Sequence, residues 1–257
     1  MTRVLWINPL GTHVFDEPIR EELERVKRSD TDVEVRSLGR GPHHLEYACY
    51  EAAAVPDILA TLVQAEREGF DASVIGCFYD TGLRPAREVT SRMAVAAPCE
   101  SAVHIASTLG DSFSVVVGRR KWVPEMRDNV IRYGYRDRLA SFKVLELGVH
   151  DFQKDPDETH RRIAAAGREA VERDDAEVIV LGCTAEFGFF EQLQQELAVP
   201  VIDATVAPFK YAELLGEAAR LGWRTSKVGG YAAPPDAELD AFGLAAQLSL
   251  SADLAVR

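Results

Sequence analysis

Short apolar runs alternate with longer amphipathic stretches along the whole chain. The apolar runs are rich in β-branched residues and predict strands at 3–7, 33–35, 72–76, 113–117, 144–147, 177–181 and 199–202. Apolar residues at helical spacing predict helices at 16–28, 51–68, 85–93, 101–109, 124–133, 157–172, 187–197 and 207–221. Because parallel strands need crossover helices, this alternation predicts an α/β fold with mostly parallel sheets.

The sequence contains a possible internal repeat. Asp71-Ala72 opens an apolar run that ends in Gly76-Cys77, and Asp175-Ala176 opens one that ends in Gly182-Cys183. The order of elements around the two runs also matches, which favours two similar halves over chance likeness between two buried strands. We predict a first domain at 1–97 plus 205–235, a second at 98–204, and a C-terminal tail at 236–257 without an assigned role.

The charge balance narrows the choice of partners. The 257 residues carry 29 Lys and Arg against 41 Asp and Glu, which gives a formal net charge of −12. An acidic surface repels phosphate backbones and anionic membranes, so we expect neither nucleic acid nor a membrane as a partner. No apolar run reaches the ~18 residues of a membrane helix. The first apolar run is short and is cut by Asn8 and Pro9, so we expect a cytoplasmic protein.

Two of the four cysteines occupy matching places. Cys77 and Cys183 each follow a predicted strand, and ligands of open α/β sheets bind beyond the carboxyl ends of strands. Backbone N–H groups and helix N-termini at such places favour thiolate over thiol, so we expect both pKa values to be lowered. Cys49 and Cys99 lack matching partners, and we interpret them as packing residues.

Two opposed thiols suit one kind of reaction. A base removes a proton from one face of a carbon, and an acid returns a proton to the other face, which inverts the centre. The charge that develops on the adjacent carbonyl oxygen needs donors, for which we expect loop amides near Asp80, Gly118 and Thr184. A metal site at His43, His44 and Glu46 is not indicated, because adjacent histidines usually point apart.

Several motifs carry a family resemblance. They are Ile7-Asn8-Pro9, Gly41-Pro42 with Glu46, the run from Gly76-Cys77-Phe78-Tyr79-Asp80 to Leu83, Leu181-Gly182-Cys183, and the segment from Leu221 to Ala232. At these residues the chain resembles the aspartate/glutamate racemase superfamily, specifically its hydantoin/allantoin racemase branch. The resemblance implies two Rossmann-like domains with four-stranded parallel sheets, related by a pseudo-twofold axis, with a cleft between them.

The resemblance also implies a function. It implies a racemase that needs no metal, pyridoxal phosphate or other cofactor, acts on a small molecule and forms a homo-oligomer. Its catalytic pair would be Cys77 and Cys183. The substrate contacts that it implies are Asn8, Pro42, Phe78, Tyr79, Asp80, Val117, Gly118 and Thr184.

The chain departs from the family pattern at four places, the first being Leu10, which follows Asn8-Pro9 where the family usually has a second asparagine. Tyr79 stands where a glycine is common and is expected to narrow the pocket, and Thr81 stands where a proline is common. Glu186 adds a carboxyl group after the second cysteine.

Three functions therefore remain as hypotheses. They are a racemase of a 5-substituted hydantoin or related cyclic amide, a racemase of an amino acid or its derivative, and a non-catalytic small-molecule binding protein. Phe78 and Tyr79 follow Cys77, where aspartate and glutamate racemases usually carry Asn-Thr, which disfavours the second.

Overall fold

Two parallel sheets organise the protein. The computed structural model describes residues 1–248. The first sheet has the order β2-β1-β3-β4, and its strands are β1 (Thr2–Asn8), β2 (Thr31–Ser37), β3 (Ala72–Ile75) and β4 (Ala94–Ala96). The second has the order β6-β5-β7-β8, with β5 (Phe113–Val117), β6 (Leu139–Val144), β7 (Val178–Leu181) and β8 (Val201–Ile202). Every strand pair is parallel, which confirms the predicted α/β class with two four-stranded sheets.

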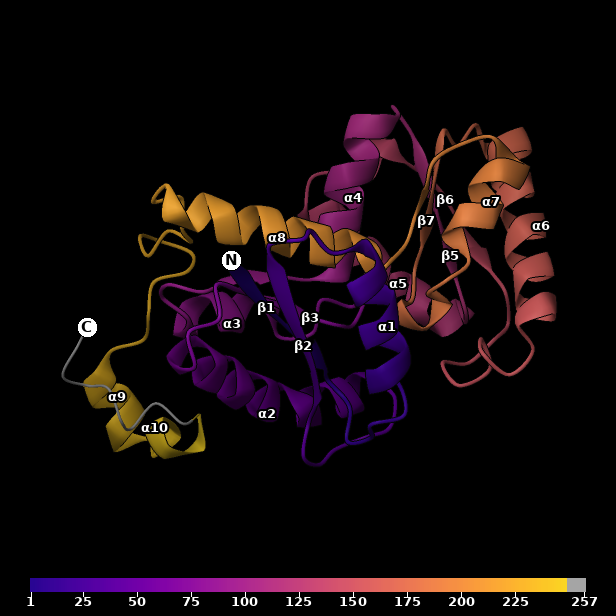
Figure 1. The fold of residues 1–257 in the computed structure, drawn as a ribbon. Coiled ribbons are helices and arrows are strands. Elements are labelled where there is room, and N and C mark those ends of the chain that lie inside the picture. Colours follow the sequence, from indigo (N-terminus) through magenta and orange to yellow (C-terminus); the bar gives the residue numbers. More distant parts are fainter. Residues whose placement is uncertain (249–257) are drawn as a thin grey trace.

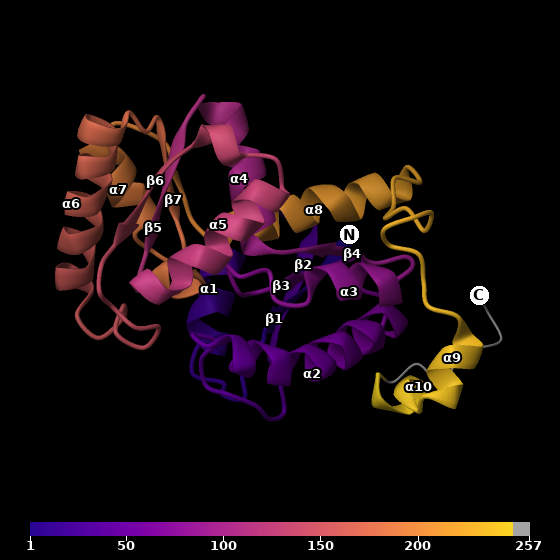
Figure 2. The same cartoon turned by 180° about the vertical axis from the view of Figure 1, so that it is seen from behind.

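Helices cover both faces of each sheet, which explains why β3 and β7 are buried along their whole length. The helices around the first sheet are α1 (Asp16–Val26), α2 (Ala48–Arg67), α3 (Leu83–Val89) and α8 (Val206–Arg220). Those around the second are α4 (Pro98–Leu109), α5 (Val123–Arg132), α6 (Pro156–Asp174) and α7 (Phe190–Leu197). Figures 1 and 2 show the two sheets as separate lobes with α4 and α8 at their junction.

The chain returns to its first lobe after completing the second. Helix α8 begins after β8 and packs on β1, β3 and β4 of the first sheet as well as on α4. Its buried residues include Phe209 and Ala212, which belong to the same apolar cluster as Val4 and Trp6 of β1. In Figure 1 α8 lies along one face of the first sheet and α2 along the opposite face.

The structure corrects two strand predictions. The strand predicted at 144–147 is wrong, because β6 runs from Leu139 to Val144 and Leu145 follows it as loop. Strand β4 was not predicted at all. Both are edge strands, and Ala140, Ser141 and Lys143 interrupt the apolar pattern of β6, so its periodicity in the sequence is weak.

The tail predicted at 236–257 begins with ordered structure. It forms α9 (Asp236–Ala241) and α10 (Leu244–Gln247), shown in yellow in Figure 1. Leu239, Ala245 and Leu248 belong to the apolar cluster of the first lobe. Residues 249–257 lie outside the described part of the chain. Among the helices of residues 1–248, none is long and apolar enough to cross a membrane.

Candidate active site

The glycine before each candidate cysteine extends its strand in the same way in both lobes. Gly76 N–H donates to the Ile7 carbonyl at 2.8 Å, and Gly182 N–H donates to the Val116 carbonyl at 2.7 Å. A Cβ at Gly76 would lie 2.7 Å from the Trp6 ring, and one at Gly182 would lie 2.7 Å from the Val116 oxygen. Both positions therefore exclude a side chain, and each glycine leads from its strand to a cysteine with the same kind of backbone hydrogen bond to the neighbouring strand.

Cys77 and Cys183 line one cavity between the lobes, with a volume of about 60 Å³. The two sulfur environments match in one respect, because the backbone N–H two positions later, at Tyr79 and at Ala185, lowers the pKa of each thiol. The complete lining is Pro9, Leu10, His44, Leu45, Glu46, Gly76, Cys77, Phe78, Tyr79, Trp122, Met126, Val149, Gly182, Cys183 and Thr184. The structure thus brings both predicted cysteines to the same cavity.

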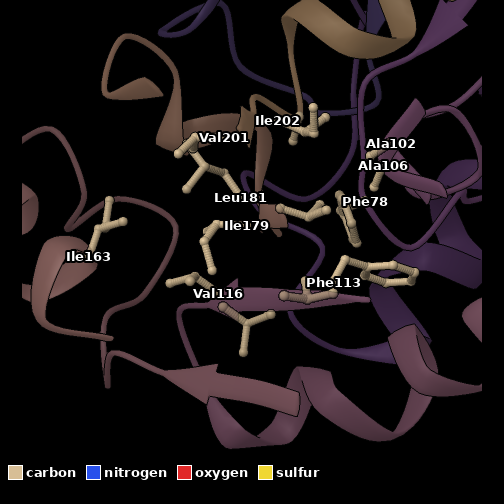
Figure 3. Close-up of a cluster of buried hydrophobic side chains, with 14 of the residues drawn as sticks. Phe78, Ala102, Ala106, Phe113, Val116, Ile163, Ile179, Leu181, Val201 and Ile202 are labelled. Carbon is tan, nitrogen blue, oxygen red and sulfur yellow. The ribbon is translucent and has the colours of Figure 1, made fainter. Parts of the chain in front are cut away.

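The loop after Cys77 crosses from the first lobe into the core of the second. Phe78 and Tyr79 belong to the same buried cluster as Phe113, and Figure 3 shows Phe78 among the apolar side chains of the second lobe. The Tyr79 carbonyl accepts a hydrogen bond from the Asn129 side-chain amide at 2.7 Å. Phe78 and Tyr79 therefore line the cavity and also anchor the first cysteine loop to the opposite lobe.

Asp80 fixes the end of this loop. Its carboxyl oxygens accept the backbone N–H groups of Cys99 and Glu100 at 2.8 and 2.9 Å, at the start of α4, and the Tyr133 hydroxyl at 2.6 Å. These bonds hold Asp80 at a φ of 54°, in the left-handed region. Its N–H donates to the Cys77 carbonyl, so this expected oxyanion donor is occupied. Asp80 is not among the cavity-lining residues.

Thr184 ties the second cysteine loop to the first. Its hydroxyl donates to the Gly76 carbonyl at 3.3 Å, and its own carbonyl accepts the Thr205 hydroxyl at 3.0 Å. Thr184 also lines the cavity, as the sequence predicts for a substrate contact.

Polar and aromatic side chains from both lobes meet beside the cavity. The buried Glu46 carboxylate accepts the Val149 N–H at 3.0 Å and pairs with Arg119 at 3.0 Å. The ring of His44 lies 6.0 Å from that of His150, measured between centroids. Within residues 1–248, no three or more His, Cys, Asp or Glu side chains are grouped as metal ligands.

The expectation of lowered thiol pKa values is wrong. Burial, followed by the charge of Glu51, raises the pKa of Cys77 to about 12. Burial, followed by the charge of Glu186, raises the pKa of Cys183 well above its usual value. The Tyr79 and Ala185 amides act in the expected direction, but desolvation of the charged form outweighs them. The unliganded protein therefore favours two neutral thiols.

Glu186 lies behind the second cysteine. Its side chain is fully buried, and neither carboxyl oxygen has a hydrogen-bond partner of good geometry among the described residues. Burial raises its pKa well above the usual value, and the nearby Asp203 adds to this rise. The neutral acid is favoured, so Glu186 adds less charge to the pocket than its residue type alone indicates.

Besides Asp80, four predicted contacts lie outside the cavity lining. The Asn8 side chain donates to Asp16, and the Pro42 carbonyl accepts the Gly11 N–H. Val117 is fully buried in β5. The last is Gly118, which packs against the ring of Trp122.

Sequence reasoning missed part of the cavity wall. Trp122, Met126 and Val149 come from the second lobe and had no motif of their own. Pro9 and Leu10 line the cavity from the first lobe, and they directly follow Asn8. The opening motif therefore indicated this part of the wall, although Asn8 itself does not line it. The interpretation of Cys49 as a packing residue is wrong, because it is exposed, whereas Cys99 is buried.

Comparisons with known proteins point to one family. Residues 4–212 match the model of the Asp/Glu/Hydantoin racemase family. A hydantoin racemase from Pseudomonas sp. (strain NS671) is 37% identical over 92% of this chain and 95% of its own length. One from Paenarthrobacter aurescens is 36% identical over 91% and 98%.

Solved structures agree with the sequence relatives. An allantoin racemase from Klebsiella pneumoniae superposes with a TM-score of 0.85 at 29% identity, covering 91% of this chain and 94% of its own. An arylmalonate decarboxylase variant, at 13% identity over 84% of this chain and 93% of its own, shares the fold with a TM-score of 0.65. The chain therefore belongs to the Asp/Glu/Hydantoin racemase family, and it is a racemase, a class of isomerase.

Proposed function

We propose that the protein interconverts the enantiomers of a 5-substituted hydantoin or an allantoin-like ring by proton transfer between the ring carbon and Cys77 and Cys183. The observation that carries the proposal is that both sulfur-bearing residues line one cavity at equivalent strand ends. The names of the related hydantoin and allantoin racemases support the same substrate class.

The chemistry needs one thiolate and one thiol. The thiolate removes the proton from the C–H that lies between a ring carbonyl and a ring nitrogen, and the electron pair moves onto the carbonyl oxygen. The opposite thiol then gives its proton to the other face of the same carbon, and the electron pair returns. One proton leaves and one arrives, so the product is the enantiomer and the two cysteines have exchanged protonation states.

Desolvation suits this reaction. A thiolate in a cavity that raises its pKa is a stronger base than one in water, which favours removal of a proton from a weak carbon acid. The raised pKa values also keep the second cysteine protonated and able to donate. The matching N–H groups of Tyr79 and Ala185 stabilise whichever sulfur carries the charge.

The cavity wall favours a neutral ring over a free amino acid. No Lys or Arg is among the residues that line it, and Glu46 is the lining carboxylate. A buried substrate carboxylate needs a paired positive charge, which this lining does not supply. Leu10, Trp122 and Met126 instead provide apolar surface for a ring and its substituent.

Hydrogen–deuterium exchange tests the proposal directly. Purified protein is incubated in D₂O, without added cofactor, with each enantiomer of 5-benzylhydantoin, with allantoin, and with aspartate and glutamate. We expect proton NMR to show loss of the C–H signal of a ring substrate, and polarimetry to show loss of rotation, above the enzyme-free rate. The double variant Cys77→Ser/Cys183→Ser is the control. Exchange with the amino acids but with neither ring would contradict the proposed substrate class.

A further inference from the structure

A second cavity lies between β4, α8 and the segment that follows α8. It has a volume of about 510 Å³ and shares no lining residue with the cavity that holds Cys77 and Cys183. Residues 222–226 and Tyr231 form one of its walls. These residues belong to the segment from Leu221 to Ala232, one of the motifs that resemble the family, and the proposed reaction gives this segment no role.

Hydrogen bonds hold the two sides of this second cavity in place. The Lys227 ammonium group donates to the backbone carbonyls of Arg87 and Glu88, which docks the segment after α8 onto the end of α3 (Figure 2). On the other side, the Glu66 carboxylate accepts the backbone N–H groups of residues 91–93 at 2.7, 2.6 and 2.9 Å. Both sides are therefore fixed to the first lobe by bonds of their own.

Two guanidinium groups of the second cavity have no carboxylate partner. Arg87 is already satisfied, because it donates to Glu100 Oε1 at 2.8 Å and to the Val95 carbonyl at 2.9 Å. Arg92 and Arg224 also line the cavity and are exposed, and within residues 1–248 neither of them forms an ion pair. In a protein with a formal net charge of −12, such a locally positive cavity attracts a small anion.

Much of the remaining wall is apolar or aromatic. Met93, Tyr211, Leu215 and Trp223 all line the cavity. The Trp223 side chain is 74% exposed, so its ring can pack on a ligand and lose contact with water. The wall thus combines positive charge with surface for an aromatic ring.

We propose that the second cavity binds a small aromatic carboxylate, whose carboxylate group pairs with Arg92 and Arg224 and whose ring packs on Trp223. The planar guanidinium group matches a carboxylate with paired donors, so arginine selects this anion well. A neutral hydantoin ring lacks the charge that these arginines recognise. The two cavities therefore select different molecules, and this second site does not depend on the mechanism proposed for Cys77 and Cys183.

Titration with 3-phenylpropionate tests the site, followed by calorimetry and by tryptophan fluorescence. Trp6 and Trp122 are buried, whereas Trp223 is exposed, so Trp223 reports on whether its surface is in contact with water. We expect saturable binding and a shift of the emission to shorter wavelength as the ligand shields the Trp223 ring. The amide 3-phenylpropionamide has the same shape without the charge and should bind at least tenfold more weakly.

Surface variants locate the bound molecule. Arg92→Ala and Arg224→Ala should each weaken binding about tenfold or more, the effect of losing one hydrogen bond between charged groups. Trp223→Phe should remove the emission shift while calorimetry still detects binding. Arg173→Ala is the matched control, because Arg173 is an exposed residue of α6 in the second lobe and its removal changes the net charge by the same amount.

Each outcome decides for or against the second site. Absence of saturable binding, equal binding of the acid and the amide, or undiminished binding in both arginine variants would overturn it. If light scattering showed an oligomer that dissociates in Trp223→Glu, a second copy of the chain would cover the cavity, which would also overturn the proposal. Charge-dependent binding in a protein that exchanges no hydantoin proton would support the second site and reject only the proposed substrate.

Discussion

The hydroxyl of Thr184 donates to the carbonyl of Gly76 at 3.3 Å, which joins the residue after one cysteine to the residue before the other. The bond crosses from the second lobe to the first. In the opposite direction, Phe78 of the first cysteine loop enters the core of the second lobe. Each thiol is thus positioned partly by the lobe that carries its partner, and movement between the lobes would change the space between the two sulfurs.

Removal of either thiol should stop inversion but leave part of the exchange. In Cys77→Ser or Cys183→Ser, the remaining thiolate can still remove a proton from the face that it approaches, but the opposite acid is lost. We expect racemisation to fall by about 10²–10⁴-fold, the range for a general acid or base. We also expect deuterium to enter one enantiomer without inversion. Chiral chromatography with NMR measures both rates.

Cys49→Ser is the matched control for these variants. Cys49 is an exposed thiol and is not among the cavity-lining residues, so its removal should leave racemisation unchanged. Full racemisation in either Cys77→Ser or Cys183→Ser would contradict the two-thiol scheme.

Glu186 should make stability depend on pH. Burial raises its pKa in the folded protein well above the usual 4.5, so the folded state holds a proton that the unfolded state has lost. Its contribution is complete below pH 4.5 and is lost as pH rises towards the folded pKa, by about 1.4 kcal/mol per pH unit within that window. Glu186→Gln keeps the shape without the titration, so it should stabilise the protein more at pH 8 than at pH 5.

Urea unfolding at the two pH values measures this difference. Glu172→Gln serves as the control, since Glu172 is an exposed residue of α6, and it should change stability equally at both. If Glu186→Gln were more destabilising at pH 8 than at pH 5, Glu186 would be an ionised group with a partner.

The repeated element order and the two Gly-Cys strand ends were predictable because apolar periodicity and β-branched runs are local properties of the chain. That information predicted the two sheets and the two thiols that share the cavity. It missed β4 and misplaced β6, whose short or interrupted apolar runs gain their strand character from neighbouring strands.

A cavity-lining residue could be predicted from the sequence only where it belongs to one of the family-like motifs. Asp80 belongs to the Cys77 motif, yet its carboxyl group accepts hydrogen bonds from the start of α4 and from Tyr133 and does not line the cavity. Met126 and Val149 line the cavity from separate parts of the second lobe. No local sequence pattern indicates that these two residues come together there. The direction of the thiol pKa shifts depends on how deeply the assembled fold buries each sulfur, and it therefore required the structure.

Gly182 should tolerate no side chain. An added Cβ would lie 2.7 Å from the Val116 carbonyl oxygen and equally close to Val117 Cγ1, both in the buried strand β5. We expect Gly182→Ala to lower the free energy of unfolding by about 1–3 kcal/mol, the usual cost of overpacking, and to reduce kcat by shifting Cys183. Urea unfolding and initial racemisation rates measure the two effects. Gly39→Ala is the control, because nothing lies within 4 Å of its added Cβ, and a loss of equal size there would contradict the steric argument.

Tyr79 should restrict the size of the ring substituent. Its side chain is buried at the cavity wall, and its main chain is held by Asn129, so truncation should enlarge the cavity without releasing the loop. We expect Tyr79→Ala to raise the ratio of kcat/KM for 5-benzylhydantoin over 5-methylhydantoin roughly tenfold, the lower end of the discrimination that a small change in an apolar pocket produces. Tyr135→Ala is the matched control, because its ring packs on His104 and it is not among the cavity-lining residues. An unchanged ratio in Tyr79→Ala would place the ring substituent against another part of the wall, where Trp122 and Met126 are the next side chains to truncate.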